Sequence, residues 1–151
     1  MNDSTVHVRV VSWDQARPGA SAVREQVFVH EQHVPPELEW DGLDPRCVHV
    51  VARVGSGEVV GTARMLADGH IGRMAVLPAW RGRGVGSALL RALLEEARRR
   101  GIEHPFLHAQ TTAVGFYLRH GFAIAGNEFI DAGIPHVAMV RDPGPGQAPG
   151  S

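Results

Sequence analysis

The sequence predicts an α/β (α+β) domain in which helices cover a mixed, mostly antiparallel central sheet of about six or seven strands. Three observations predict this class. Three β-rich runs follow one another between residues 48 and 77, the clearest amphipathic helix spans residues 85–100, and short β-rich runs return after residue 105. The predicted order of elements is therefore β, α, β, β, β, α, β, α, β, β.

Near the amino terminus, Val6, Val8 and Val10 alternate with polar side chains, which predicts a half-buried first strand. A helix is expected over residues 20–30, where valines are spaced one turn apart. Residues 33–46 are rich in proline and acidic side chains, and this composition is typical of a loop that can contain a turn of helix.

The middle of the chain predicts a meander. A glycine-rich turn at residues 55–57 separates β-rich runs at residues 48–54 and 58–66, which indicates a hairpin. A second turn at Asp68-Gly69 then leads into a third antiparallel strand at residues 70–77.

The second half begins with the helix at residues 85–100, whose apolar side chains form one stripe and which Gly101 ends. A short strand is expected at residues 105–109. Either Thr111 or Thr112 is expected to cap a second helix. The last predicted elements are this helix, which runs to His120 and ends at Gly121, and two strands at residues 122–125 and 135–141.

The chain has 151 residues, of which 44% are apolar, and this fits a single domain, expected over residues 1–141. The Pro/Gly-rich residues 142–151 are expected to form a flexible tail. A net charge of −1 argues against a nucleic-acid partner, which normally requires a basic excess. The single cysteine excludes an internal disulfide, and neither a leader nor an apolar run of membrane-spanning length is visible, so a cytoplasmic location without a membrane partner is expected.

The most informative motif is the loop at residues 81–87, Arg-Gly-Arg-Gly-Val-Gly-Ser, which follows a predicted strand and begins a predicted helix. Glycines let the backbone approach an oxyanion, and the amino terminus of a helix offers free N–H groups to a phosphate. The loop has neither the spacing of a P-loop nor the third glycine of a dinucleotide-binding fold. Its pattern is Arg/Gln-x-x-Gly-x-Gly/Ala, filled by Arg81, Gly84 and Gly86.

This loop resembles the coenzyme A diphosphate loop of the GNAT (GCN5-related) N-acetyltransferase family. That family's Phe-Tyr-x-x-x-Gly-Phe segment is matched by Phe116, Tyr117, Gly121 and Phe122. Together with residues 24–35 and 129–139, these motifs resemble the ElaA-like (YjcF-like) subgroup. The resemblance covers about residues 20–141 and implies the GNAT fold, an acetyl-CoA cosubstrate and N-acetyltransferase activity.

The resemblance also implies how acetyl-CoA is bound. The strand before the loop supplies backbone groups to the pantetheine arm, and a backbone N–H at Met74 or Ala75 stabilises the oxyanion. The residues expected to bind the cosubstrate are Met74, Ala75, Val76, Arg81, Gly82, Arg83, Gly84, Val85, Gly86 and Ser87. The expected acceptor is a small-molecule or peptide amine, and a homodimer is compatible with the resemblance.

By the same resemblance Tyr117, the only tyrosine, is the general acid that protonates the leaving thiolate. The general base stays open, because Gly72 and Arg73 stand where many family members have a glutamate. Glu31 is ranked first among the candidates, which also include Asp41, His49, His108 and His136. The residues expected to bind the acceptor are Arg24, Gln32, Asp41, His49, His108, Gln110 and His136.

Two other functions are compatible with the same glycine-rich loop. One is a non-catalytic acyl-CoA-binding sensor, and the other is an acyltransferase with another acyl donor or an O-linked acceptor. The nine histidines do not predict a metal, because the sequence has no cysteine cluster and no His-Glu-x-x-His motif. Cys47 is not an obvious nucleophile, so direct transfer in a ternary complex without a metal is expected.

Overall fold

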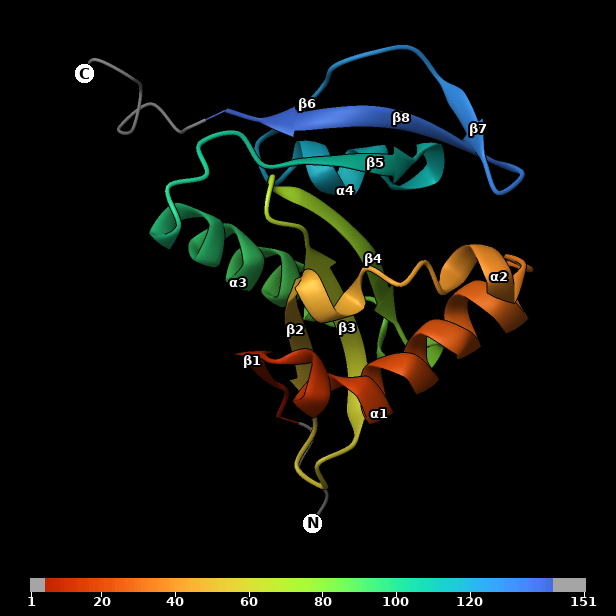
Figure 1. Cartoon of the computed structure of the whole chain (residues 1–151), viewed down its shortest axis with the longest axis vertical. Coiled ribbons are helices and arrows are strands. Elements are labelled where there is room, and N and C mark those ends of the chain that lie inside the picture. Colours follow the sequence, from red (N-terminus) through yellow and green to blue (C-terminus); the bar gives the residue numbers. More distant parts are fainter. Residues whose placement is uncertain (1–4, 143–151) are drawn as a thin grey trace.

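The computed structural model describes residues 5–142, in which helices cover one eight-stranded sheet (Figure 1). The strand order is β1-β2-β3-β4-β5-β8-β6, and β7 pairs with β8. All neighbouring strands are antiparallel except β4 and β5, so the predicted mixed α/β fold is confirmed. Apart from Asp142, the predicted flexible tail lies outside the described residues.

Within the described residues, the strands are β1 (His7–Val11), β2 (Val48–Arg53), β3 (Val59–Met65), β4 (His70–Val76), β5 (Phe106–Gln110), β6 (Phe122–Ile124), β7 (Phe129–Asp131) and β8 (Ile134–Arg141). The α-helices are α1 (Trp13–Arg24), α2 (Pro36–Glu39), α3 (Val85–Arg99) and α4 (Val114–Leu118). A π-helix (Glu25–Glu31) continues α1, and short 3-10 turns occupy Asp44–Arg46, Pro78–Trp80 and Thr111–Ala113.

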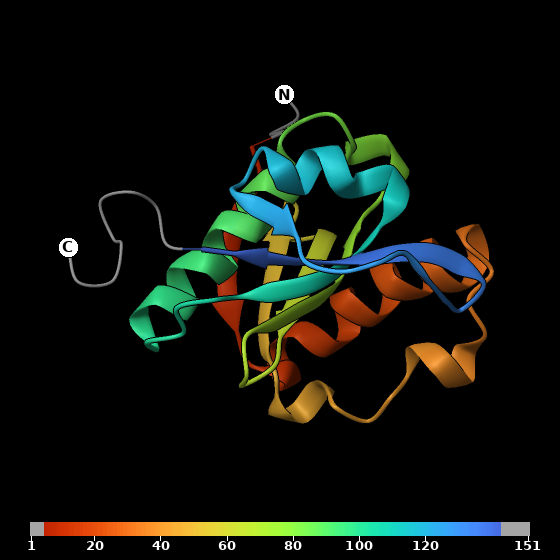
Figure 2. The same ribbon diagram turned by 90° about the horizontal axis from the view of Figure 1, so that it is seen from above.

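Helices α1 and α3 pack on opposite faces of the sheet (Figure 2). Successive side chains of a strand point to opposite faces, so Val50 of β2 joins the core under α3 and Val51 joins the core under α1. Strands β2 and β3 are therefore buried on both faces. This double burial explains why apolar residues follow one another in these strands. A strand with one exposed face would instead alternate apolar and polar residues.

Helix α1 begins well before the predicted start. Ser12 Oγ accepts a hydrogen bond from the backbone N–H of Gln15 at 3.3 Å, and Gln15 Oε1 accepts one from the N–H of Ser12, which together form a capping box. Pro18 and Gly19 disfavour a helix interior yet lie within α1. Gly19 permits close packing, because a Cβ built on it would lie 2.3 Å from Val59 Cγ2 on β3.

Helix α4 also begins differently from the prediction. A 3-10 turn covers Thr111 and Thr112, and the N-cap residue of α4 is Ala113, with no capping hydrogen bond from a side chain. The expected threonine cap is therefore wrong. Gly121, with φ of 86°, follows the end of this helical segment as predicted.

Strands β4 and β5 diverge after a short contact. In the part of the chain that the structure describes, only two residue pairs join them, His70 with Phe106 and Ile71 with Leu107, although both strands continue further. In Figure 1, β5 and β8 run nearly horizontally, whereas β2 and β3 run nearly vertically. The second half of β4 consequently has an unpaired edge facing β5.

A β-bulge lies in the same part of β4. Arg73 and Met74 together stand opposite Ala63 of β3, where regular pairing would place one residue. Arg73 adopts a φ of 50°, which is uncommon for a residue with a side chain. The bulge bends β4 just where β5 leaves it.

Candidate functional site

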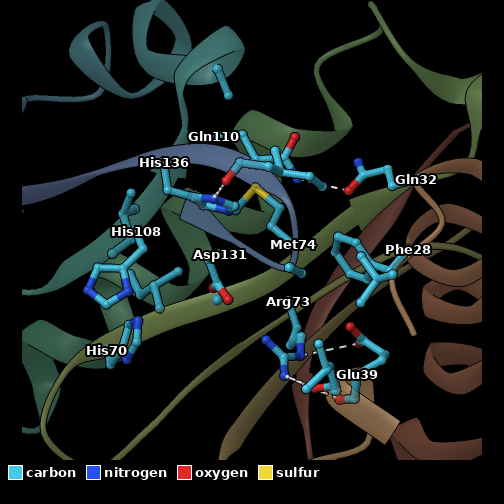
Figure 3. A pocket seen from close by; sticks show the side chains of 18 of the residues that line it. Phe28, Gln32, Glu39, His70, Arg73, Met74, His108, Gln110, Asp131 and His136 are labelled. Carbon is cyan, nitrogen blue, oxygen red and sulfur yellow. Dashed lines mark hydrogen bonds and ion pairs between the residues drawn. The ribbon is translucent and has the colours of Figure 1, made fainter. Parts of the chain in front are cut away.

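A cavity of about 360 Å3 lies where β4 and β5 diverge, and we call it the β4–β5 cavity (Figure 3). Its walls come from β4, β5, the π-helix, the loop that follows it and the β7–β8 turn. The sequence-predicted site residues that line it are Gln32, Met74, His108, Gln110, Tyr117 and His136. The fold therefore brings together residues that lie far apart in the sequence.

Tyr117 lies on α4, and its hydroxyl is 3.9 Å from the sulfur atom of Met74. The rings of Phe116 and Phe122 meet its ring nearly edge-on. Desolvation raises the pKa of Tyr117 to about 12, so the phenol keeps its proton at neutral pH. A group in this state can donate a proton to a thiolate that develops beside it.

His136 stands on β8, and its Nδ1 lies 2.7 Å from the carbonyl oxygen of Ile134. A carbonyl oxygen only accepts hydrogen bonds, so Nδ1 carries the hydrogen and Nε2 of the neutral ring keeps a lone pair. The ring also stacks on Phe129, with centroids 5.9 Å apart. His136 thus combines a fixed ring with the lone pair that a general base requires.

Further rings continue this wall of the cavity. His108 packs edge-on against Phe129 at 5.2 Å and lies 4.7 Å from His70. His70 stacks on Phe106 at 4.8 Å. Burial, together with the neighbouring His108, lowers the pKa of His70. One side of the cavity is therefore an aromatic surface, whereas Gln110 on another side donates a 2.8 Å hydrogen bond to Gln32.

Asp131, at the end of β7, lines the same cavity but was not predicted as a site residue (Figure 3). Within residues 5–142, no hydrogen bond or ion pair engages its carboxylate. The turn after it places Ala132 at φ 52° and Gly133 at φ 77°, as in a tight two-residue hairpin. The sequence signal was only an acidic residue before an Ala-Gly pair, which does not distinguish a cavity wall from an ordinary turn.

Three residues that were expected to bind the acceptor do not line this cavity: Arg24, Asp41 and His49. Arg24 is only 1% exposed and donates hydrogen bonds to Glu39 at 2.8 Å and to Asp44 at 2.7 Å. His49 Nε2 lies 2.8 Å from the backbone oxygen of Asp44, and burial lowers its pKa. Arg24 and His49 therefore belong to the interior beneath the segment of residues 33–46, which we call the acidic loop.

The ion pairs of this interior extend to two more arginines. Arg64 of β3 binds Asp41 and Asp44, and Arg73 of the bulge lies 3.2 Å from Asp41 and 3.3 Å from Glu39. Burial disfavours ionised carboxylates, but the arginines hold the pKa of Asp41 and Asp44 below its usual range. At Glu39 desolvation is the larger effect and raises the pKa. We call these three acids, with Arg24, Arg64 and Arg73, the acidic-loop network.

A second cavity, of about 370 Å3, lies over the glycine-rich loop, and we call it the loop cavity. It is lined by Val76, Trp80, Arg81, Gly82, Gly84, Val85, Gly86, Ser87, Phe116 and Arg119. Gly84 is the N-cap residue of α3, has a φ of 82°, and would have no heavy atom within 4 Å of an added Cβ. The free N–H groups of the first turn of α3 and this open glycine backbone fit an anion such as a diphosphate.

The side chain of Arg81, which lines the loop cavity, is held by hydrogen bonds to Glu31 and Val76. Its guanidinium makes two 2.7 Å hydrogen bonds to Glu31, and its Nε donates to the carbonyl oxygen of Val76 at 3.0 Å. These hydrogen bonds lower the pKa of Glu31, which lines neither cavity. The structure thus places Glu31, the first-ranked base, as the partner of a cation. Arg83 instead lies over the ring of Trp80, 5.0 Å from its centroid.

The two cavities share the same two elements. On β4, Met74 lines the β4–β5 cavity, and Val76, two residues further on, lines the loop cavity. On α4, Tyr117 lines the first cavity and Phe116 the second. A long substrate that follows the unpaired edge of β4 can therefore reach from the start of α3 to the hydroxyl of Tyr117.

Within residues 5–142, no three histidine, cysteine or acidic side chains are grouped as a metal site would require, and no helix has the length and hydrophobicity to cross a membrane. Cys47 lines neither cavity, its thiol donates to the oxygen of Leu43 at 3.3 Å, and burial raises its pKa. A raised pKa makes a thiol a weaker nucleophile at neutral pH.

Comparison with known proteins defines the class. The model of the acetyltransferase (GNAT) domain matches residues 13–142. The chain therefore belongs to the GNAT family of acetyltransferases. The strand β4, the glycine-rich loop and the helix α3 that follows it are the parts of the structure that the family resemblance led us to expect.

Within this family the chain is similar to several individual proteins. The chain is 42% identical over 123 residues to the uncharacterised N-acetyltransferase YjcF of Bacillus subtilis, and the aligned region covers 80% of this chain and 88% of that protein. Escherichia coli ElaA has a similar structure, with a TM-score of 0.81 and 27% identity over 91% of this chain and 100% of that chain. An acyl-CoA N-acyltransferase from Pseudomonas aeruginosa gives a TM-score of 0.81 and 28% identity over 91% of this chain and 99% of that chain. The predicted resemblance to the ElaA-like (YjcF-like) GNAT proteins is confirmed.

Proposed function

We propose that this protein is an acetyl-CoA-dependent N-acetyltransferase that transfers the acetyl group to an amine in a ternary complex. The observation that carries the proposal is the unpaired edge of β4, which joins a diphosphate-sized loop cavity to a second cavity containing Tyr117 and His136. The loop residues from Arg81 to Ser87 would hold the diphosphate, and Met74, Ala75 and Val76 would offer backbone groups to the pantetheine arm.

In this mechanism His136 Nε2 accepts a proton from the amine, directly or through water, and the amine nitrogen attacks the thioester carbon. The backbone N–H of Met74, or of its neighbour Ala75, stabilises the oxyanion. As the carbon–sulfur bond breaks, the Tyr117 hydroxyl gives its proton to the sulfur. The pairing of Glu31 with Arg81 favours His136 over Glu31 as the base.

The acceptor is a cationic amine in this proposal. The three acids of the acidic-loop network already pair with arginines, whereas the Asp131 carboxylate in the cavity wall has no such partner among the described residues. An ammonium group can therefore pair with Asp131 before it loses its proton. Direct transfer is supported by Cys47, whose half-buried thiol lies outside both cavities.

The test is an acceptor screen with acetyl-CoA, read by thiol release and by the mass of the product. Amines and peptides with free amino groups should yield N-acetylated products, and release without an acceptor should be slow. Hydroxyl analogues of the active amines and longer acyl-CoA donors separate the two acyltransferase alternatives. Tight binding of acetyl-CoA without turnover of any amine would instead identify an acyl-CoA sensor.

A further inference from the structure

The hydroxyl of Ser87 is held by a histidine that has no role in the mechanism above. Ser87 is in the first turn of α3 and lines the loop cavity. Its Oγ lies 3.0 Å from Nε2 of His120, which follows α4. The His120 ring packs on Phe116 with centroids 4.9 Å apart, so the imidazole is fixed behind Ser87.

Cations surround this imidazole on three elements. Arg91 comes from α3, Arg119 adjoins His120 after α4, and Arg141 of β8 donates its Nε hydrogen to the His120 backbone oxygen at 2.9 Å. Burial and then these three arginines lower the pKa of His120, and within residues 5–142 no carboxylate opposes them. The ring is consequently neutral in the free protein at neutral pH.

The presence or absence of a hydrogen on Nε2 of His120 decides what Ser87 can offer to the cavity. When Nε2 carries only a lone pair, the serine hydroxyl donates its hydrogen to it and turns oxygen lone pairs toward the cavity. These lone pairs repel an anion. When Nε2 carries a hydrogen, it donates to Ser87 Oγ, and the serine hydrogen becomes free to bind a phosphate oxygen.

We propose that His120 is a positioning residue for the diphosphate of acyl-CoA, and that diphosphate binding takes up one proton from solvent onto His120. The protonated ring then holds Ser87 as a hydrogen-bond donor to the phosphate. This inference rests on the proposed use of acyl-CoA. The negative charge of the diphosphate offsets the repulsion from Arg91, Arg119 and Arg141, which favours the protonated ring in the complex.

The sign of the pH effect follows from linkage. Because the ligand raises the pKa of His120 above its value in the free protein, affinity is highest below the free-protein pKa. Affinity then falls as the pH rises, by up to about tenfold per pH unit for one linked proton, until the pKa of the complex is passed.

The probe is dephospho-CoA, which carries the diphosphate but lacks the phosphate monoester that itself titrates near pH 6. Calorimetry at one pH in two buffers with different ionisation enthalpies counts the protons taken up, and a series from about pH 6 to about pH 8 gives the affinity profile. The wild-type protein should take up protons on binding and lose affinity toward high pH.

Two variants and one control locate the effect. His120→Gln keeps an N–H donor for Ser87 without a titrating group, so it should bind with a flat pH profile and no proton uptake. Ser87→Ala should bind more weakly and lose the advantage of low pH. His104→Gln, at an exposed histidine that lines neither cavity, should behave as wild type. Thermal melting confirms that each variant is folded.

The outcomes separate this inference from the function it rests on. Wild-type binding without proton uptake, or uptake that persists in His120→Gln, overturns the role of His120. Unchanged affinity and pH profile in Ser87→Ala overturn the action through Ser87. If the folded wild-type protein binds neither CoA nor dephospho-CoA, the proposed use of acyl-CoA fails, and this inference fails with it.

Discussion

Tyr117 owes its chemical character to its surroundings. Among the described residues its hydroxyl reaches only the weakly accepting sulfur of Met74, and desolvation raises its pKa to about 12. A phenol in such a site stays protonated, and it gains a strong acceptor only when negative charge forms on a nearby sulfur. Its hydrogen bond is therefore strongest in the transition state, which is the requirement for lowering the barrier.

Replacement of Tyr117 by phenylalanine tests this role at the cost of one hydroxyl. We expect kcat to fall by about 10²–10⁴-fold, the usual contribution of a general acid. The Kd for acetyl-CoA and the melting temperature should change little, because the ring and its contacts with Phe116 and Phe122 remain. Steady-state kinetics and calorimetry measure both.

A packing role for Tyr117 would give the reverse result, with a lower melting temperature and full turnover per folded molecule. Because its pKa is about 12, ionisation of Tyr117 should not limit the wild-type rate at neutral or mildly alkaline pH. If the wild-type rate falls near pH 8 because the general acid loses its proton, that acid is a group other than Tyr117.

At the scale of elements, the start of α3 combines a left-handed glycine with an open cavity. Gly84→Val adds a β-branched side chain at φ 82°, which costs about 1–2 kcal/mol of folding stability. It also fills space beside the first N–H groups of α3. We expect acetyl-CoA to bind at least about tenfold more weakly, a loss of about 1.4 kcal/mol, as measured by calorimetry.

Gly101 provides the matched control at the other end of the same helix. It has a φ of 74°, and no heavy atom of the described residues lies within 4 Å of an added Cβ, yet α3, a helix of 15 residues and about 22 Å in length, separates it from Gly84. Gly101→Val should lose similar stability and keep wild-type affinity. Equal loss of affinity in both variants would show that helix stability, rather than the loop, sets the binding of acetyl-CoA.

Elements with strong local signals were predicted correctly. The β2–β3 hairpin has a glycine-rich turn, and α3 has an apolar stripe with a glycine stop, so no bound of these elements differs from the prediction by more than one residue. The start of α1 was missed because Pro18 and Gly19 are locally unfavourable, whereas Gly19 is favoured by its contact with Val59. Such tertiary contacts do not appear in a local pattern.

The residues expected from family motifs line the cavities more often than the other expected site residues, and the functional roles of both groups stay predictions. Tyr117, Met74 and the residues of the glycine-rich loop other than Arg83 line the two cavities. Arg24 was expected near the acceptor, but it is buried because acids from a separate loop neutralise it in three dimensions. Strand β7 and Asp131 were missed because three residues paired across a short turn carry almost no periodic signal.

At the scale of the whole molecule, the acidic-loop network connects the acidic loop to the sheet through ion pairs. Arg24 sits between Glu39 and Asp44, with all three side chains nearly inaccessible to solvent. Arg24→Met keeps much of the volume but leaves two buried acids with one cation fewer. We expect a loss of about 3–5 kcal/mol in the free energy of unfolding, measured by denaturant titration.

An exposed arginine provides the control for this expected loss of stability. Arg98 on α3 pairs with Glu95 at 2.7 Å, but both side chains are largely exposed to solvent. Arg98→Met should leave stability unchanged within error, because surface ion pairs contribute little. Wild-type stability in Arg24→Met would mean that the network is not what holds the loop.

The bulge residue Arg73 has a consequence for anyone who would redesign this protein. Its guanidinium donates 3.2 Å hydrogen bonds to the backbone oxygens of Leu38 and Glu39, while its own backbone adjoins Met74. Grafting a foreign loop onto the acceptor side would therefore disturb the backbone that is proposed to hold the thioester. Engineered changes of specificity should be easier from the β7–β8 turn, which borders the same cavity without that tether.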